Sequence, residues 1–396
     1  MTPTYKYYKE VFRGRQMPFA FVDLDLFDEN IRQVAARARG KQIRVASKSL
    51  RCIELLKRTL QAGSPYQGVM TYSGPETVWL SQKGFDDLLL GYPIWHPQQI
   101  EDICGEVKKG KSIILMVDLK EHVIHLNEVG KKCSTVIPVC MDIDMTSVFL
   151  GMRFGVWRSS ITHVNPALEL YKTIQDLPFV KLVGLMGYEA AIAGVGDKMK
   201  GKFLQNAAVR FFKNKSAKEI SIRRAEITEV LKKYGAQLRF VNGGGTGSLE
   251  WTTLEDTVTE VTVGSGLYFS ALFDNYSNFR HLPAAAFAVE IVRHPAENIY
   301  TCLGGGYIAS GSAGADKQPK PYLPEGFKLI PNEGAGEVQT PISYQGAEKL
   351  HPGDPVFFRH AKAGELCERF NSLLMVSRGK VTDEALTYRG EGKSFL

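Results

Sequence analysis

A lysine that follows an apolar segment is the first candidate for covalent chemistry. Lys48 closes the segment 43–48, IRVASK, which has the β-branched, apolar composition of a buried strand. We expect an amine at the end of such a strand to lose hydration, and an amine in that setting is suited to Schiff-base formation. A lysine that only ends the strand and reaches solvent would have the same sequence. Lys48 alone leaves both interpretations open.

Two glycine-rich turns predict a phosphate site. One is the segment 242–247, NGGGTG, after a predicted strand at 238–244, and the other is the segment 264–266, GSG, after a predicted strand at 258–265. Glycines let backbone N–H groups approach an anion closely, and nearby hydroxyls add donors. The residues expected to bind a phosphate are Gly244, Gly245, Thr246, Gly247, Gly264, Ser265 and Gly266.

An amine and a phosphate site that face each other suit pyridoxal phosphate. Its aldehyde condenses with an amine, its phosphate rests on backbone amides, and its ring draws electrons from the Cα of an amino acid. Enzymes that act on sugar phosphates use such lysines too, so this combination alone does not decide between the two.

Other predicted strand ends carry polar residues. Asp142 and Asp144 close the segment 135–144, Arg153 follows it, and Tyr188 with Glu189 closes the segment 181–188. Arg153 could orient Lys48, the phenolic oxygen of the cofactor or a substrate carboxylate, and Tyr188 could stack near the ring. The alternative for Arg153 is an ion pair with an aspartate that fixes a loop.

The elements that must position these residues follow from an alternation of β-branched runs with amphipathic stretches. Helical segments such as 51–63 and 75–84 end on glycine. Eight such units favour an α/β fold, a (β/α)8 barrel, in which all strand ends meet at one mouth; an open doubly wound sheet is the alternative. The predicted strands are 43–48, 68–73, 87–92, 112–118, 135–144, 181–188, 238–244 and 258–265.

A second, β-rich domain is predicted beside the barrel. The segment 19–26 predicts a strand outside the barrel, with Asp25 as N-cap of the helix that follows. After about residue 280, short strands separated by Gly and Pro replace helical periodicity, and 310–326 is predicted to be a long exposed loop. We expect residues 25–280 to form the barrel, and residues 1–24 and 281–396 to form the β-rich domain.

Composition argues against several classes of partner. The net charge is +7, but most Lys and Arg residues are interspersed with acids, which gives no specific support to nucleic-acid binding. The six cysteines form no CxxC pair, which favours reduced thiols. The N-terminus has no apolar leader, and the most apolar run, 113–117, is too short for a bilayer. We therefore expect a cytoplasmic protein with no membrane or nucleic-acid partner.

Several motifs together resemble the fold-type III pyridoxal-phosphate enzymes, which share the alanine racemase N-terminal barrel. The motifs are PFAFVDLDLFDENI, VASKSLRC, PETVWLSQKGFDDLLLGYP, GMRFGV, GLMGYEA, NGGGTG and TEVTVGSGLYF, in this order. They are most similar to the branch of D-threonine aldolase and D-serine dehydratase. The resemblance implies a barrel with a β-rich domain, a homodimer, Lys48 as the cofactor lysine, the two turns as its phosphate site, and Arg153 and Tyr188 beside it.

One departure from that branch concerns a metal. The relatives carry a His-x-Asp or His-x-Cys metal pair, whereas this chain has His360 followed by Lys362 at the second position. His360 could still bind zinc or manganese together with Glu365 or Cys367, since carboxylate and thiolate both suit zinc. A lone histidine is also common as a structural residue. His360 is thus a candidate catalytic base, and His360 with Cys367 is a candidate metal pair.

The C-terminal segments offer a further polar cluster. His360, Lys362, Glu365, Arg369, Arg389 and Glu391 either complete a substrate-specific part of the site or form a surface ion-pair network.

Three functions are compatible with these residues. The leading hypothesis is a lyase that cleaves or dehydrates a small β-hydroxy-D-amino acid, with an amino-acid substrate held on the cofactor. A racemase is the alternative, with Lys48 on one face of Cα and Tyr307 on the other. A pyridoxal-phosphate carrier without catalytic activity is the alternative of another class, although it needs no β-rich domain.

Overall fold

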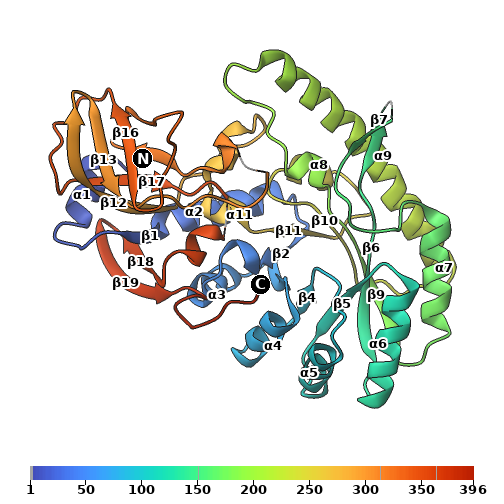
Figure 1. Ribbon diagram of the computed structural model, residues 1–396. Helices are drawn as coiled ribbons and strands as arrows, with labels where there is room; N and C mark the ends of the chain where they lie inside the picture. Colours follow the sequence, from blue (N-terminus) through green and yellow to red (C-terminus); the bar gives the residue numbers. More distant parts are fainter. Residues whose placement is uncertain (1–2, 150, 313, 363) are drawn as a thin grey trace.

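The chain folds into a closed parallel barrel and an adjoining mixed sheet (Figure 1). The computed structural model describes residues 3–149, 151–312, 314–362 and 364–396. The barrel order is β10-β11-β2-β3-β4-β5-β6-β9, with every neighbouring pair parallel. The predicted (β/α)8 barrel is confirmed. Its strands are β2 (Gln42–Ala46), β3 (Tyr66–Thr71), β4 (Leu88–Leu90), β5 (Ile113–Val117), β6 (Ile137–Asp142), β9 (Val180–Gly187), β10 (Phe240–Gly243) and β11 (Glu260–Val263).

Helices surround the barrel strands. The long ones are α2 (Leu24–Arg37), α3 (Ile53–Gln61), α4 (Gly74–Gln82), α5 (Pro97–Lys108), α6 (Lys120–Lys132), α7 (Val164–Gln175) and α9 (Phe203–Lys233). The shorter ones are α8 (Ala190–Ala193), α10 (Leu249–Thr252) and α11 (Ser265–Tyr268). The remaining helix, α1 (Tyr5–Val11), packs against the second sheet instead.

The predicted cap of α2 is wrong by two residues. Asp23 is the N-cap, because its carboxylate accepts hydrogen bonds from the backbone N–H groups of Asp25 and Leu26. Asp25 lies inside the first turn, and its carboxylate accepts hydrogen bonds from Ser377 and Arg378 of the adjoining sheet. The helix therefore begins directly where β1 ends, without a connecting turn.

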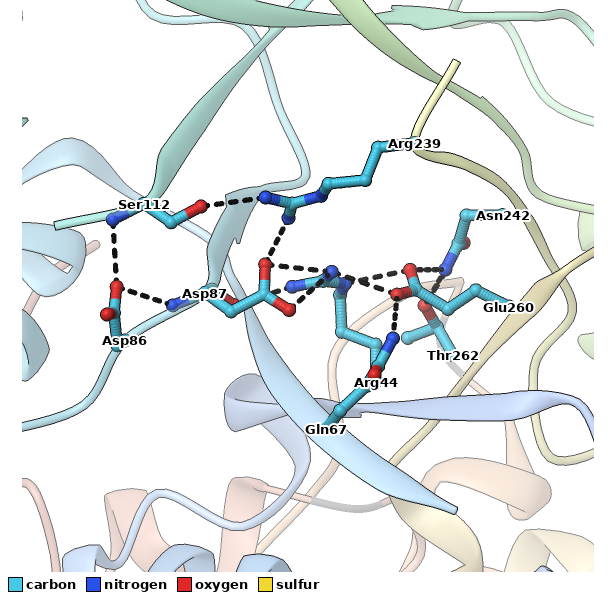
Figure 2. Close-up of polar contacts among 9 residues, drawn as sticks. All are labelled: Arg44, Gln67, Asp86, Asp87, Ser112, Arg239, Asn242, Glu260 and Thr262. Carbon is cyan, nitrogen blue, oxygen red and sulfur yellow. Dashed lines mark hydrogen bonds and ion pairs between the residues drawn. The ribbon is translucent and has the colours of Figure 1, made fainter. Parts of the chain in front are cut away.

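The end of the barrel opposite the strand C-termini is filled by a buried ionic network (Figure 2). Arg44 of β2 donates to both carboxylate oxygens of Glu260 of β11 at 2.8 and 2.9 Å, and to the carbonyl oxygen of Asp87 at 2.6 Å. Asn242 of β10 donates to the same glutamate at 2.7 Å. The Arg44 and Glu260 side chains are each only 1% exposed, so each charge depends on the other. This network joins the strands at which the barrel closes.

The second sheet combines the N-terminal strand with C-terminal strands. β1 (Phe19–Asp23) pairs antiparallel with β12 and parallel with β18, in a nine-stranded sheet. The predicted loop 310–326 is not wholly a loop, because β14 forms its last part and pairs with β17; residue 313 lies outside the described residues. The other strands are β12 (Ala285–Ala296), β13 (Ile299–Leu303), β14 (Lys320–Leu323), β15 (Phe327–Leu329), β16 (Gln339–Tyr344), β17 (Pro355–Arg359), β18 (Ser372–Ser377) and β19 (Lys380–Leu386).

A two-stranded hairpin stands outside both sheets. β7 (Ser147–Phe149) and β8 (Met152–Phe154) follow the barrel strand β6, and β7 lies beside α9 (Figure 1). None of the helices within the described ranges has both the length and the apolar character that a bilayer-spanning segment needs.

Candidate active site

Lys48 lies at the mouth of the barrel, but not on a strand. It belongs to a short 3-10 helix, Ser47–Ser49, that follows the end of β2, and its side chain is exposed. The expectation of a lysine on the last residue of a buried strand is therefore wrong, because β2 ends at Ala46 and the chain turns outward there. The Lys48 ammonium donates a hydrogen bond to the Tyr92 hydroxyl at 3.0 Å.

Tyr92 is a residue that the sequence analysis missed. Burial alone raises the pKa of Tyr92, but the charges of Lys48 and Arg158 outweigh that effect and hold the pKa below its ordinary value. A phenol of this kind is a good hydrogen-bond acceptor for an amine. Tyr92 closes the predicted strand 87–92, so its place at the mouth could have been found from the same strand-end argument that identified Lys48.

The two glycine-rich turns meet each other beside Lys48. The backbone N–H of Gly266 donates to the Thr246 hydroxyl at 3.0 Å, which joins the second turn to the first. The Ser265 and Ser49 hydroxyls lie 3.4 Å apart. At Gly264 a Cβ would lie 2.6 Å from the Ser49 hydroxyl oxygen, so only glycine permits this approach. The structure thus brings both turns into contact with the segment that carries Lys48.

Glu189 supports the first glycine-rich turn, residues 242–247, from the protein interior. Its buried carboxylate accepts hydrogen bonds from the Gly244 N–H at 2.8 Å and from the Ser248 hydroxyl at 3.2 Å, and it pairs with the fully buried Arg224. Gly244 has a φ of +86°, a conformation that favours glycine. Glu189 therefore fixes the turn from the protein side.

Donors of the first turn remain available on its open side. Within the part of the chain that the structure describes, the N–H groups of Thr246 and Gly247 have no protein acceptor. Buried or half-buried N–H groups without an acceptor are favourable partners for an anion. The turns and Lys48 together fit pyridoxal phosphate.

Arg153 is engaged within its own loop. It donates to the Asp144 carboxylate at 2.7 Å and to the Val156 carbonyl at 2.8 Å, and it lies over the ring of Trp157. This is the loop-fixing ion pair that the sequence analysis gave as the alternative for Arg153. The Asp144 side chain is only 5% exposed, so its charge depends on this pair.

Arg158 is a second arginine near the mouth, beside the rings of Tyr92 and Tyr188. Its guanidinium carbon lies 5.4 Å from the ring centre of Tyr188 and 5.6 Å from that of Tyr92. Burial raises the pKa of the Tyr188 hydroxyl to about 12, so this phenol stays protonated. No sequence motif marks Arg158, since it lies in an irregular loop after β8.

Asp142 is the carboxyl group at this mouth with the most altered proton affinity. Burial and the nearby Asp118 carboxylate raise its pKa to about 7, although Arg158 acts in the opposite direction. A group with this pKa can accept or donate a proton near neutral pH.

The predicted metal pair does not fit a metal ion. The His360 ring is buried against the edge of Tyr268, and neither ring nitrogen has a partner among the residues that the structure describes. Burial and the charge of Arg359 lower the pKa of His360 to about 3. The Cys367 thiol donates to the Leu50 carbonyl at 3.2 Å, and burial raises its pKa. Among the described residues, no three His, Cys, Asp or Glu side chains gather as metal ligands.

The predicted polar cluster of the C-terminal segments is dispersed. Lys362 donates to the Ser310 carbonyl at 3.3 Å, and Glu365 accepts from the Ser310 N–H at 2.8 Å. Glu391 pairs with Lys83 of the barrel. His360, buried in the interior, is not placed as a base at the mouth. Lys362 and Glu365 thus share Ser310 as a partner, whereas Glu391 contacts the barrel.

Sequence comparison identifies a family model and distant relatives. Residues 22–271 match the model described as the alanine racemase N-terminal domain. The 3-hydroxy-D-aspartate aldolase of Paracoccus denitrificans (strain Pd 1222) is 23% identical over 258 residues, which are 65% of this chain and 61% of that enzyme. The match thus spans less than two thirds of the relative's length.

Solved structures share the fold over nearly the whole chain. D-threonine aldolase from Filomicrobium marinum superimposes with a TM-score of 0.80 at 17% identity, covering 95% of both chains. D-threo-3-hydroxyaspartate dehydratase from Delftia sp. HT23 superimposes with a TM-score of 0.75 at 18% identity, covering 94% of this chain and 98% of the dehydratase. The barrel and the second sheet therefore occur together in these proteins.

Proposed function

The chain belongs to the alanine racemase N-terminal domain family, and from this we propose that it is a pyridoxal-phosphate-dependent lyase acting on small β-hydroxy-D-amino acids. The observation that carries the proposal is the meeting of Lys48 with two glycine-rich turns at one barrel mouth. The names of the aldolase and dehydratase relatives support the choice of retro-aldol cleavage or dehydration as the reaction.

The residues present fit the cofactor. Thr246, Gly247 and Ser265 would receive the phosphate, and Lys48 would bind the aldehyde carbon. When bound, pyridoxal phosphate supplies an electron-withdrawing ring that stabilises negative charge at the substrate Cα. Tyr188 lies against Gly245, where a Cβ would approach its ring within 3.0 Å, so its ring forms one wall of the site.

Proton transfer is assigned to Tyr92 and Asp142. Tyr92 accepts the hydrogen bond of the Lys48 amine and is positioned to take a proton from it. Asp142, at the end of β6, has a pKa of about 7 and would accept the β-hydroxyl proton of the substrate. This assignment replaces His360, which lies in the interior with a low pKa. The side chains around His360 do not fit a metal ion, and we therefore assign no step of the reaction to a metal.

The lyase is favoured over the racemase by the place of Tyr307. A racemase needs a second base on the face of Cα opposite Lys48. Tyr307 packs edge-on against Phe287 and Phe370, and a Cβ on Gly304 would lie 3.6 Å from its hydroxyl oxygen. These contacts belong to the second sheet and its loops, so Tyr307 is engaged within its own domain.

Product analysis tests the proposed activity. Purified protein loaded with pyridoxal phosphate is mixed with D-threonine, D-serine, D-threo-3-hydroxyaspartate and their L-enantiomers. An aldehyde with glycine indicates an aldolase, and ammonia with a keto acid indicates a dehydratase. An inverted enantiomer would instead establish the racemase. Cofactor binding by the wild-type protein without any product would favour the carrier.

We also propose a homodimer in a reducing, cytoplasmic environment. Large apolar side chains are exposed in the loop after β8 and at the start of α9: Trp157 is 85% exposed, Phe203 78% and Leu204 82%. Exposed apolar patches of this kind are typical of protein interfaces. The six cysteines form no disulfide in the described chain, which supports the reducing environment. Sedimentation of wild-type protein and of Leu204→Glu tests the dimer.

A further inference from the structure

Two arginines near the hairpin β7–β8 are candidates for an anion-binding role, and the structure separates them. Arg153 donates to Asp144 at 2.7 Å, to Val156 at 2.8 Å and to the Thr146 hydroxyl at 3.2 Å. Turning Arg153 toward a ligand would leave the buried Asp144 carboxylate without its counter-ion, which is unfavourable. Arg153 is therefore committed to the loop through Nη2, whereas its buried Nε has no partner among the described residues.

Arg158 is not committed in this way. Its side chain is exposed at the mouth, and it makes no ion pair within the described ranges of the chain. Its guanidinium lies against the rings of Tyr92 and Tyr188. A planar guanidinium beside aromatic rings keeps its N–H groups free to form a two-point pair with a carboxylate.

The protein's own carboxylates do not neutralise Arg158 permanently. Asp118 is within 3.1 Å of the His122 ring nitrogen and accepts from the Ser160 N–H at 3.2 Å. Asp142 is the remaining carboxyl group near Arg158, and it is half protonated near neutral pH, with a pKa of about 7. The positive charge of Arg158 is thus available to an anionic ligand.

Arg158 and Lys48 approach the same aromatic ring. The Lys48 nitrogen lies 5.5 Å from the ring centre of Tyr92, and the Arg158 guanidinium carbon lies 5.6 Å from the same centre. Both cations therefore lie near the same ring. A ligand whose amino end is directed to the Lys48 position can present a carboxylate to Arg158.

We propose that Arg158 binds a carboxylate of the amino-acid substrate, beside the rings of Tyr92 and Tyr188. The inference rests on the proposed cofactor chemistry at Lys48. The carboxylate is either the α-carboxylate that all amino acids share or the side-chain carboxylate of a hydroxyaspartate. Loss of a charge-assisted pair of this kind weakens binding by about 10- to 100-fold.

The test measures binding of two amino acids to the cofactor-loaded protein by the change in cofactor absorbance. The variants are R158Q, R158K and, as a matched control, R293Q, an exposed arginine of β12. We expect R158Q to bind D-threonine and D-threo-3-hydroxyaspartate about 10- to 100-fold more weakly than wild type. R158K should restore part of this affinity, and R293Q should bind both amino acids as wild type does. Cofactor affinity should stay within about twofold in all three variants, because none of the substitutions touches the glycine-rich turns.

The outcomes show whether Arg158 binds a substrate carboxylate, and which one. Weaker binding of both amino acids by R158Q assigns Arg158 to the α-carboxylate. Weaker binding of D-threo-3-hydroxyaspartate alone assigns Arg158 to the side-chain carboxylate. The inference is overturned if R158Q binds both amino acids like R293Q, or if R158Q loses the cofactor itself. If wild-type protein binds no cofactor, the proposed function fails together with this inference; if it binds cofactor and R158Q matches wild type, this inference alone fails.

Discussion

The substitution Glu189→Gln tests whether the first glycine-rich turn binds the cofactor. Glu189 accepts the Gly244 N–H at 2.8 Å and pairs with Arg224, whose side chain is 0% exposed. The substitution removes one of the two carboxylates that neutralise Arg224, since Glu255 is the other. Breaking a buried pair on one side costs about 3–5 kcal/mol. We expect a loss of unfolding free energy toward the lower end of this range, because Glu255 and the Gly187 carbonyl remain as partners.

The same substitution should weaken cofactor binding by a separate route. It replaces a charged acceptor of the Gly244 N–H with a neutral one, and a hydrogen bond to a charged group contributes about 1.5–3 kcal/mol. We therefore expect the dissociation constant for pyridoxal phosphate, measured by absorbance titration, to rise about 10-fold or more. Urea unfolding of the cofactor-free protein measures the change in unfolding free energy that the substitution causes.

Glu255→Gln is the matched control for this experiment. It breaks the other side of the Arg224 pair but does not touch Gly244. We expect a similar loss of stability with cofactor affinity within about twofold of wild type. Equal weakening of cofactor binding by Glu189→Gln and Glu255→Gln, or no weakening by either, would refute the role given to Glu189 and to the turn.

Three further predictions follow from the same structure. Asp142→Asn should remove the fall in kcat/KM below about pH 7, because the wild-type carboxyl must be ionised to accept a proton; an unchanged pH profile would exclude Asp142 as the base. The raised pKa also means that wild type loses stability relative to Asp142→Asn as pH rises from about 4 to about 7, as pH-dependent unfolding can show. Glu260→Gln should lower the unfolding free energy by about 3–5 kcal/mol, whereas replacing Arg44 and Glu260 together by methionine should restore most of it. Chelator treatment should leave activity unchanged. A loss of activity that zinc or manganese reverses would contradict the conclusion that the side chains around His360 do not fit a metal ion.

The barrel and the two turns could be predicted because their signals are local. Each barrel strand is a short apolar run bounded by turn residues, and the strand ends form one mouth in this fold. Glycines at 244 and 264 mark positions where a side chain would be strained or would collide, so they too are visible in the sequence. Lys48 was identified by the same argument, although it lies just beyond the strand.

The partners of the polar side chains could not be predicted in the same way. Arg153 and Arg158 are five positions apart, and only the fold of the hairpin decides that Asp144 pairs with the first while the second faces Tyr92. His360 stands where the resembling enzymes carry the histidine of a metal pair, yet the fold buries its ring against Tyr268. Such outcomes depend on contacts between residues distant in the chain, which no local pattern encodes.

The direct test of the central claim is a reductive labelling of Lys48. The protein is incubated with pyridoxal phosphate, reduced with borohydride and digested, and the modified peptides are identified by mass spectrometry. We expect one principal pyridoxyl label, on Lys48, which Lys48→Ala abolishes and which Glu189→Gln reduces at limiting cofactor. Absence of label at Lys48, or equal labelling of Lys48 and surface lysines such as Lys6, would contradict this expectation.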